Sequence, residues 1–183
     1  MSKLLNVSSS PHVRCGVSTK NLMYDVAIAM LPATIWGVMQ FGIYSLIVVV
    51  ATVLSCVLSE YLFETLMHKP VTISDGSALV TGMILGLNMP PAIPLWMPIL
   101  GGVFAIIVVK QLYGGLGQNW MNPALAARCF MLISFAQAMT KFTDPVTDAV
   151  ASATPLAAIK AGDTYDLAAM FIGKIPGTIG EVS

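Results

Sequence analysis

The sequence predicts an all-α protein that crosses a membrane several times. Hydrophobic residues make up 56% of its 183 positions and charged residues only 10%, whereas a soluble domain carries about a quarter charged residues. The formal net charge is zero, so no basic field indicates a nucleic-acid partner. The third observation is a series of apolar segments, each close to the ~20 residues that a helix needs to cross the hydrocarbon core.

Five such segments follow one another along the chain. The third is unusual because it contains three glycines and ends at Pro90 and Pro91, which predicts a broken, Gly/Pro-rich helix. The segment boundaries are expected at about 22–41, 43–63, 73–91, 95–112 and 123–139.

The distribution of Lys and Arg predicts the orientation. If all five segments cross, one side holds Lys3, Arg14, Lys20, Lys69 and Lys110, and the other holds only Lys141 and Lys160. The positive-inside rule then places residues 1–21 in the cytoplasm and the loop 140–166 outside the inner membrane. A re-entrant third segment would invert everything after it, and five full crossings are the favoured arrangement.

Polar residues at the start of the third segment allow two explanations. Asp75 can cap a helix, and the glycines after it allow helices to approach closely. Alternatively, Asp75 and Thr81 line a ligand site, because polar groups are costly inside a membrane. The sequence leaves both open. Residues 88–91 end this segment, and their free backbone groups are expected to meet something polar.

The connection 114–124 also has two explanations. The simpler explanation is that Asn122 caps a helix that begins at Pro123. Otherwise Asn119 and Asn122 are two carboxamides that grip the donor–acceptor edge of a planar ring, with Trp120 as a stacking face.

Charged residues in the apolar segments have ordinary explanations. Arg128, one turn inside the fifth segment, can extend to the membrane surface or neutralise an anionic flavin. Asp25, Glu60 and Glu64 lie near cytoplasmic helix ends, where we expect solvent access to make their charges inexpensive. The cysteines at positions 15, 56 and 129 have neither zinc nor iron–sulfur spacing, and no metal site is expected.

The run 148–156 is a small-residue loop that contains Asp148, Ser152, Thr154 and Pro155. Pro155 keeps Thr154 extended, so its hydroxyl projects from the backbone. No His, Cys or Lys lies within three residues, so Thr154 is not a catalytic nucleophile. By itself the loop is a polar connector. It resembles, however, the Ser/Thr-x-Ala-Thr motif in which a transferase joins flavin mononucleotide (FMN) to a threonine through a phosphoester.

Several stretches in fixed order resemble one family. They are 10–14, 29–33, 75–91, 114–124, 152–156 and 173–181. Together they are similar to the D subunits of Rnf complexes, which are ion-translocating ferredoxin:NAD oxidoreductases. The B subunit of the sodium-pumping NADH:quinone reductase is a more distant relative. The Ser-Ala-Thr sequence here, rather than the Ser-Gly-Ala-Thr of the related G subunit, favours the D subunit.

The resemblance implies a membrane electron-transfer subunit of an ion-pumping oxidoreductase, with FMN on Thr154. It implies a second flavin, riboflavin, at Asn119 and Asn122. It also implies two inverted five-helix repeats, so residues 167–183 would begin the next segment of a longer protein. The expected partners are the flavin-bearing G subunit, the A and E subunits in the membrane, and the ferredoxin- and NAD-linked B and C subunits.

A different class of function fits the same hydropathy. An inverted-repeat secondary transporter or channel would have similar helices and no redox cofactor. A structural membrane scaffold would be colourless too, but would transport nothing. A bound yellow chromophore distinguishes the flavoprotein from both. The sequence does not decide between sodium and protons as the transported ion.

Overall fold

The computed structural model describes residues 16–143, 150–151, 160, 171–173 and 175–181. Within these residues the fold is a helical bundle, with one antiparallel pair of two-residue strands. The elements are α1 (Thr19–Phe41), α2 (Ile43–Leu66), η1 (Ile73–Asp75), α3 (Ser77–Leu87), α4 (Trp96–Val103), η2 (Phe104–Gln111), α5 (Pro123–Ser134), α6 (Ala136–Met139), β1 (Phe142–Thr143) and β2 (Val150–Ala151). Of these, η1 is a 3-10 helix, and η2 is a π-helix that continues α4.

The first two helices are long and apolar enough to cross a membrane. They contain 23 and 24 residues, which at 1.5 Å per residue exceeds the ~30 Å hydrocarbon thickness. Gly42 joins them with φ of 81°, a left-handed conformation that glycine adopts without steric cost. The shorter apolar helices are Ser77–Leu87, Trp96–Gln111 and Pro123–Ser134. All five coincide with the predicted segments, while the number of crossings stays a prediction.

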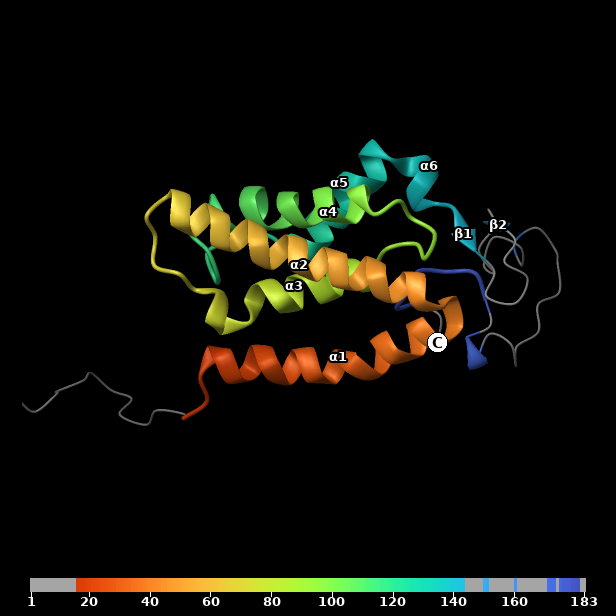
Figure 1. Ribbon diagram of the computed structural model, residues 1–183, viewed down its shortest axis with the longest axis horizontal. Helices are drawn as coiled ribbons and strands as arrows, with labels where there is room; N and C mark the ends of the chain where they lie inside the picture. Colours follow the sequence, from red (N-terminus) through yellow and green to blue (C-terminus); the bar gives the residue numbers. More distant parts are fainter. Residues whose placement is uncertain (1–15, 144–149, 152–159, 161–170, 174, 182–183) are drawn as a thin grey trace, which may run out of the picture.

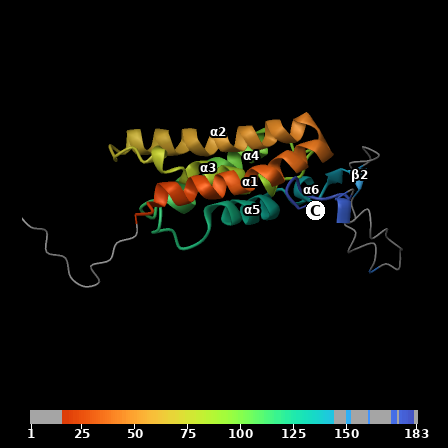
Figure 2. The same ribbon diagram turned by 90° about the horizontal axis from the view of Figure 1, so that it is seen from below.

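The elements run back and forth between two ends of the bundle (Figures 1 and 2). Helix α2 packs along both α3 and α4, and α1 packs against α3. The beginning of α1 and the connection from α2 to η1 lie at one end, with the connection from η2 to α5. The other end holds the turn between α1 and α2, the segment between α3 and α4, and the strands (Figure 1).

Glycines bring α3 close to α2. A Cβ added at Gly82 would lie 2.6 Å from the Cα of Val53, and one at Gly86 would lie 3.0 Å from the Cα of Val49. Each is a contact with backbone, which cannot move aside as a side chain can. The explanation from close helix packing is therefore confirmed for the third segment.

The third segment is broken, as predicted. Gly76 has a left-handed φ of 77° before α3, and α3 has only 11 residues, about 16 Å of helix. Residues 88–95 continue without helix, and the chain itself satisfies free carbonyls there. The Ile179 amide donates to the Met89 carbonyl at 3.1 Å, and the Gly180 amide donates to the Leu87 carbonyl at 2.8 Å.

Residues 175–181 are therefore part of this core. Ile179 is fully buried and belongs to the main hydrophobic cluster, with Leu87 and Met89. Gly37 of α1 makes room for it, because a Cβ there would lie 2.3 Å from the Ile179 carbonyl oxygen. The segment thus connects α1 to the irregular end of α3.

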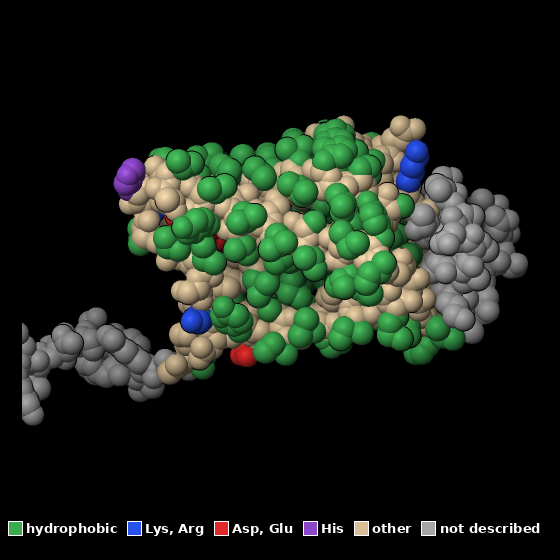
Figure 3. Space-filling view, viewed as in Figure 1, with side chains coloured by type: hydrophobic (Ala, Val, Ile, Leu, Met, Phe, Trp, Pro, Cys, Tyr) green, Lys and Arg blue, Asp and Glu red, His purple; other side chains and the backbone are tan. Residues whose placement is uncertain are grey.

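The outside of the bundle is apolar. Hydrophobic side chains cover the body of the face in Figure 3, and the charged ones visible there lie toward its two ends. Large exposed side chains include Ile28 and Ile35 on α1 and Leu54 and Leu58 on α2, each more than half exposed. A surface of this kind suits lipid or other apolar chains rather than water.

The close approach of α2 and α3 predicts that Gly82→Ala destabilises the full-length protein by about 1–3 kcal/mol, because the new methyl group overlaps the backbone of α2. Thermal unfolding in detergent measures the change. Gly101→Ala is the matched control, since its Cβ would meet only ordinary contacts of 3.4 Å or more. Equal unfolding temperatures for both variants would contradict the packing account.

Candidate functional site

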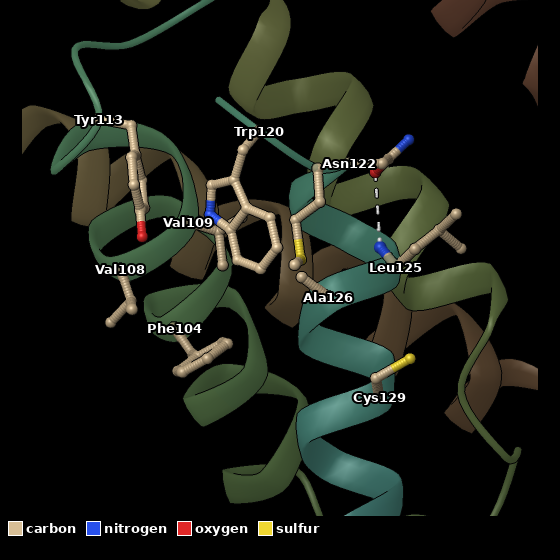
Figure 4. A pocket seen from close by; sticks show the side chains of 10 residues that line it. Phe104, Val108, Val109, Tyr113, Trp120, Asn122, Leu125, Ala126 and Cys129 are labelled. Carbon is tan, nitrogen blue, oxygen red and sulfur yellow. Dashed lines mark hydrogen bonds between the residues drawn. The ribbon is translucent and has the colours of Figure 1, made fainter. Parts of the chain in front are cut away.

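An apolar cavity of about 440 Å³ lies between η2 and α5. Aromatic and aliphatic side chains from both elements and from the connection between them form its wall (Figure 4). The lining residues are Phe104, Val108, Val109, Tyr113, Trp120, Met121, Asn122, Leu125, Ala126 and Cys129. The volume is within the usual range for a small-molecule site.

Aromatic rings dominate one side of this cavity. The Tyr113 and Trp120 ring centroids are 6.2 Å apart, with an interplanar angle of 58°. Phe104 stacks on Phe130 with centroids 4.3 Å apart, which fixes the ring of Phe104 at the wall. Trp120 is 67% exposed, so much of its ring is open to a ligand or to lipid.

Of the predicted asparagine pair, the structure brings only Asn122 to the cavity. Its Oδ1 accepts hydrogen bonds from the amides of Ala124 and Leu125 at 3.0 and 3.4 Å, and Pro123 is the first residue of α5. The predicted cap is therefore confirmed (Figure 4). Asn119 is not among the lining residues, and its Nδ2 donates to the Met121 carbonyl at 2.9 Å.

Arg128 connects three distant segments. It lies on α5, where its Nη1 donates to Oδ1 of Asn88, just after α3, and to Oε1 of Glu181 at 3.0 Å. The side chain is about one-third exposed. Arg128 thus ties residues 175–181 to the break in the third segment, and neither of the roles expected for it is needed to explain its position.

Asp75 and Thr81 have local partners. Asp75 Oδ1 accepts from the Ser77 amide at 2.8 Å and from the Ser77 hydroxyl at 2.6 Å. This satisfies a free amide in the first turn of α3, but the N-cap residue is Gly76, so Asp75 acts from one position before the expected cap. The Thr81 hydroxyl donates to the Ser77 carbonyl at 2.8 Å, one turn earlier.

The predicted flavin-attachment residues Asp148, Ser152, Thr154 and Pro155 lie outside the described residues. The described part next to them is strand β2. It pairs antiparallel with β1, with Phe142 opposite Ala151 and Thr143 opposite Val150. Ser152 directly follows β2 in the sequence.

A buried ionic cluster joins α2 to η2, and the expectation of solvent access for Glu60 and Glu64 was wrong. Glu60 is fully buried and Glu64 is 2% exposed. Lys110 Nζ lies 2.7 Å from Glu60 Oε1 and 2.6 Å from the Ser77 hydroxyl. Gln111 Nε2 donates to Glu60 Oε1 at 3.0 Å and to Glu64 Oε1 at 3.2 Å. These charges are therefore shielded by neighbouring helices rather than hydrated.

The π-helix ends with two consecutive residues that both reach Glu60. Lys110 and Gln111 are its last two residues, and both side chains are buried against α2. A π-turn has more residues than an α-turn, and such turns occur often at functional sites. Lys110 near a cytoplasmic end was predicted, but its partner 50 positions earlier in the chain leaves no signal in local sequence.

A second cavity, of about 320 Å³, opens beside this cluster. It is lined by Glu64, Lys69, Pro70, Thr72, Asp75, Gln111, Gly114, Gly115 and Leu116. In the part of the chain that the structure describes, no three His, Cys, Asp or Glu side chains are grouped closely enough to hold a metal ion.

The fold and its apolar surface define a helical membrane protein. Residues 6–183 match the model of the NQR2, RnfD, RnfE family, and the chain belongs to that family. The break at 88–91, the capped connection at 114–124 and the core segment 175–181 all lie within the matched region.

Three relatives, each the D subunit of its complex, illustrate the similarity. The chain is 46% identical to the D subunit of the Na(+)-translocating ferredoxin:NAD(+) oxidoreductase complex of Acetobacterium woodii, over 98% of the chain and 58% of that protein. It is 40% identical to the D subunit of the proton-translocating ferredoxin:NAD(+) oxidoreductase complex of Clostridium ljungdahlii, over 98% of the chain and 59% of that protein. It is also 40% identical to the D subunit of the ion-translocating oxidoreductase complex of Shewanella denitrificans, over 85% of the chain and 45% of that protein. The chain thus spans less than two thirds of their lengths.

The buried ion pair predicts that Lys110→Met destabilises the protein by about 3–5 kcal/mol, because it leaves Glu60 without its cation in a dry environment. Thermal or denaturant unfolding of the purified full-length protein measures this cost. Lys69→Met is the matched control, because Lys69 also lies beside the cluster but is exposed. If the two variants unfold alike, the ion pair is not a major source of stability.

Proposed function

We propose that this chain is the first part of the D subunit of an ion-translocating ferredoxin:NAD oxidoreductase, in which it carries electrons within the membrane. The observation that carries the proposal is the family match over residues 6–183, with relatives of that name at 40–46% identity. The partners are then the A, B, C, E and G subunits of the complex and the lipid bilayer.

Thr154 is the proposed attachment point of FMN, through a phosphoester to its hydroxyl. The Ser152-Ala153-Thr154 sequence supports this, together with the following Pro155, since a proline disfavours the helical conformation at the residue before it. The proposed topology supports it as well. Five crossings of an inverted-repeat half place residues 1–21 in the cytoplasm and the loop 140–166 outside the inner membrane.

The cavity between η2 and α5 is the proposed site of a second flavin, riboflavin. Its apolar wall and the Tyr113 and Trp120 rings fit a flat aromatic molecule. Asn122 Oδ1 is used by the helix cap, which leaves its Nδ2 as a hydrogen-bond donor. The amide end of α5 adds a positive dipole beside the ring. When bound, a flavin supplies one-electron chemistry, and the protein supplies position and electrostatics.

The relatives named above are described as translocating Na(+) in one case and protons in the other. The proposal for this chain is therefore translocation of one of these ions, coupled to electron transfer in the whole complex. In this role the chain requires no catalytic nucleophile of its own, since the redox chemistry belongs to its cofactors.

Thr154→Val is expected to abolish covalent flavin, because valine keeps the shape of threonine but has no hydroxyl to form the phosphoester. In-gel flavin fluorescence of the denatured full-length protein measures attachment. Thr147→Val is the control, because it makes the same substitution in the same loop and leaves Thr154 and its neighbours in place. Covalent fluorescence that persists in Thr154→Val would contradict the assignment.

Asn122 variants separate a helix cap from a flavin contact. Asn122→Leu removes both and should weaken binding of the second flavin by roughly one to two decades, since a lost hydrogen bond with an unpaired partner costs about 1–3 kcal/mol. Asn122→Asp keeps the cap but removes the amide donor, so it should lose flavin as well. Acid extraction of the purified protein measures the released flavin. Full retention by Asn122→Asp would assign Asn122 to capping alone.

A further inference from the structure

The ionic cluster of α2 and η2 contains more buried negative charge than positive charge. Glu60 is fully buried, and Glu64 and Lys110 are each 2% exposed. Two buried carboxyl groups therefore lie near one buried ammonium group, which contacts Glu60 at 2.7 Å. Lys69 lines the open cavity beside the cluster and is exposed. With both glutamates ionised, one negative charge would remain uncompensated on side chains that are almost fully buried.

An uncompensated charge inside a membrane protein is expensive. Two carboxyl groups that share a site resolve this by holding one proton between them, since like charges so close together disfavour double ionisation. Here the two groups contact the same atoms. Gln111 Nε2 lies within hydrogen-bond distance of both, and so does the Thr72 hydroxyl. The two carboxyl groups are therefore close enough to share one proton.

Hydrogen-bond counting also favours a proton at this pair. Thr72 has one hydroxyl proton, yet its Oγ1 contacts Oε1 of Glu60 at 3.5 Å and Oε1 of Glu64 more closely. It can donate to only one of them, so the other contact is satisfied if a carboxylic acid donates to the threonine. Glu60 Oε2, which is fully buried, has no hydrogen-bond partner within the described residues. A proton on this carboxyl reduces the cost of leaving that oxygen unsolvated.

The surrounding groups favour a proton over a metal ion. Lys110 already occupies Glu60 Oε1, and its charge repels another cation. Asp75 of η1 is half-buried and contacts Ser77, Cys56 of α2 lies beside the Gly102 carbonyl, and Lys20 and Asp25 of α1 are exposed. Helices α3 and α4 contain no charged residue.

We propose that Glu60 and Glu64 share one exchangeable proton. It is reached from the end of the bundle where α2 joins η1, through the cavity of about 320 Å³ lined by Glu64, Thr72 and Gln111. Thr72 is exposed on one side and hydrogen-bonded to the glutamates on the other, so it connects them to solvent. The proton site does not depend on any flavin.

Infrared spectroscopy of the intact complex tests this directly, because a protonated glutamate has a carboxylic-acid C=O band that an ionised one lacks. Wild type should show this band, with a shift after exchange into D₂O. Glu60→Gln and Glu64→Gln should each lose it, because the remaining carboxylate then pairs with Lys110 and needs no proton. Glu181→Gln is the control, since Glu181 is exposed and faces Arg128, and it should retain the band.

The infrared measurement does not require the complex to be catalytically active. The same band in all four proteins would overturn the proposal, and loss in only one glutamine variant would assign the proton to a single carboxyl. Disappearance of the wild-type band when K⁺ is replaced by Na⁺ would make the site one for sodium. If Glu60→Gln does not assemble, Glu64→Gln against Glu181→Gln decides alone. None of these results bears on Thr154 or on electron transfer.

Discussion

The ion pair between Lys110 and Glu60 is the interaction on which the rest of the bundle depends. It joins the middle helix α2 to η2 at 2.7 Å, and Lys110 also contacts Ser77 at the start of α3. Three elements therefore meet at one ammonium group. Because both charges are buried, this meeting is stable only if the geometry of all three elements is preserved.

The same π-helix organises the two cavities. Its last residues, Lys110 and Gln111, face the carboxylates of α2, while Phe104, Val108 and Val109 form the wall of the apolar cavity. A change in the path of η2 would thus move both surfaces together. The position of α5, and with it Trp120 and Asn122, follows from packing against η2. The polar cluster and the proposed flavin cavity are therefore structurally coupled through η2.

Local signals made much of this fold predictable. Gly42 separates the first two helices, Asn122 and Pro123 begin α5, and Pro90 and Pro91 mark the end of the third segment. Each is recognisable because the residue type itself restricts the backbone. The glycines of α3 were also interpretable, since a helix without side chains on one face can approach its neighbour closely.

Contacts between distant residues were not predictable in this way. Glu60 and Glu64 were expected near solvent, but their burial depends on Lys110 and Gln111, about 50 positions later. Likewise, Arg128 is explained by Asn88 and Glu181, which a single sequence does not bring together. The pairing of Asn119 with Asn122 was inferred from spacing, yet only Asn122 reaches the cavity, because the connection turns between them.

The central claim is that this chain belongs to a flavin-bearing electron-transfer protein, and the mass of one peptide tests it most directly. The full-length protein should be isolated from its native membrane and digested, and the peptide that contains residue 154 weighed. The account predicts a mass increased by one FMN less one water, with the added mass on Thr154. An unmodified peptide from a complex that assembles and transfers electrons would contradict it.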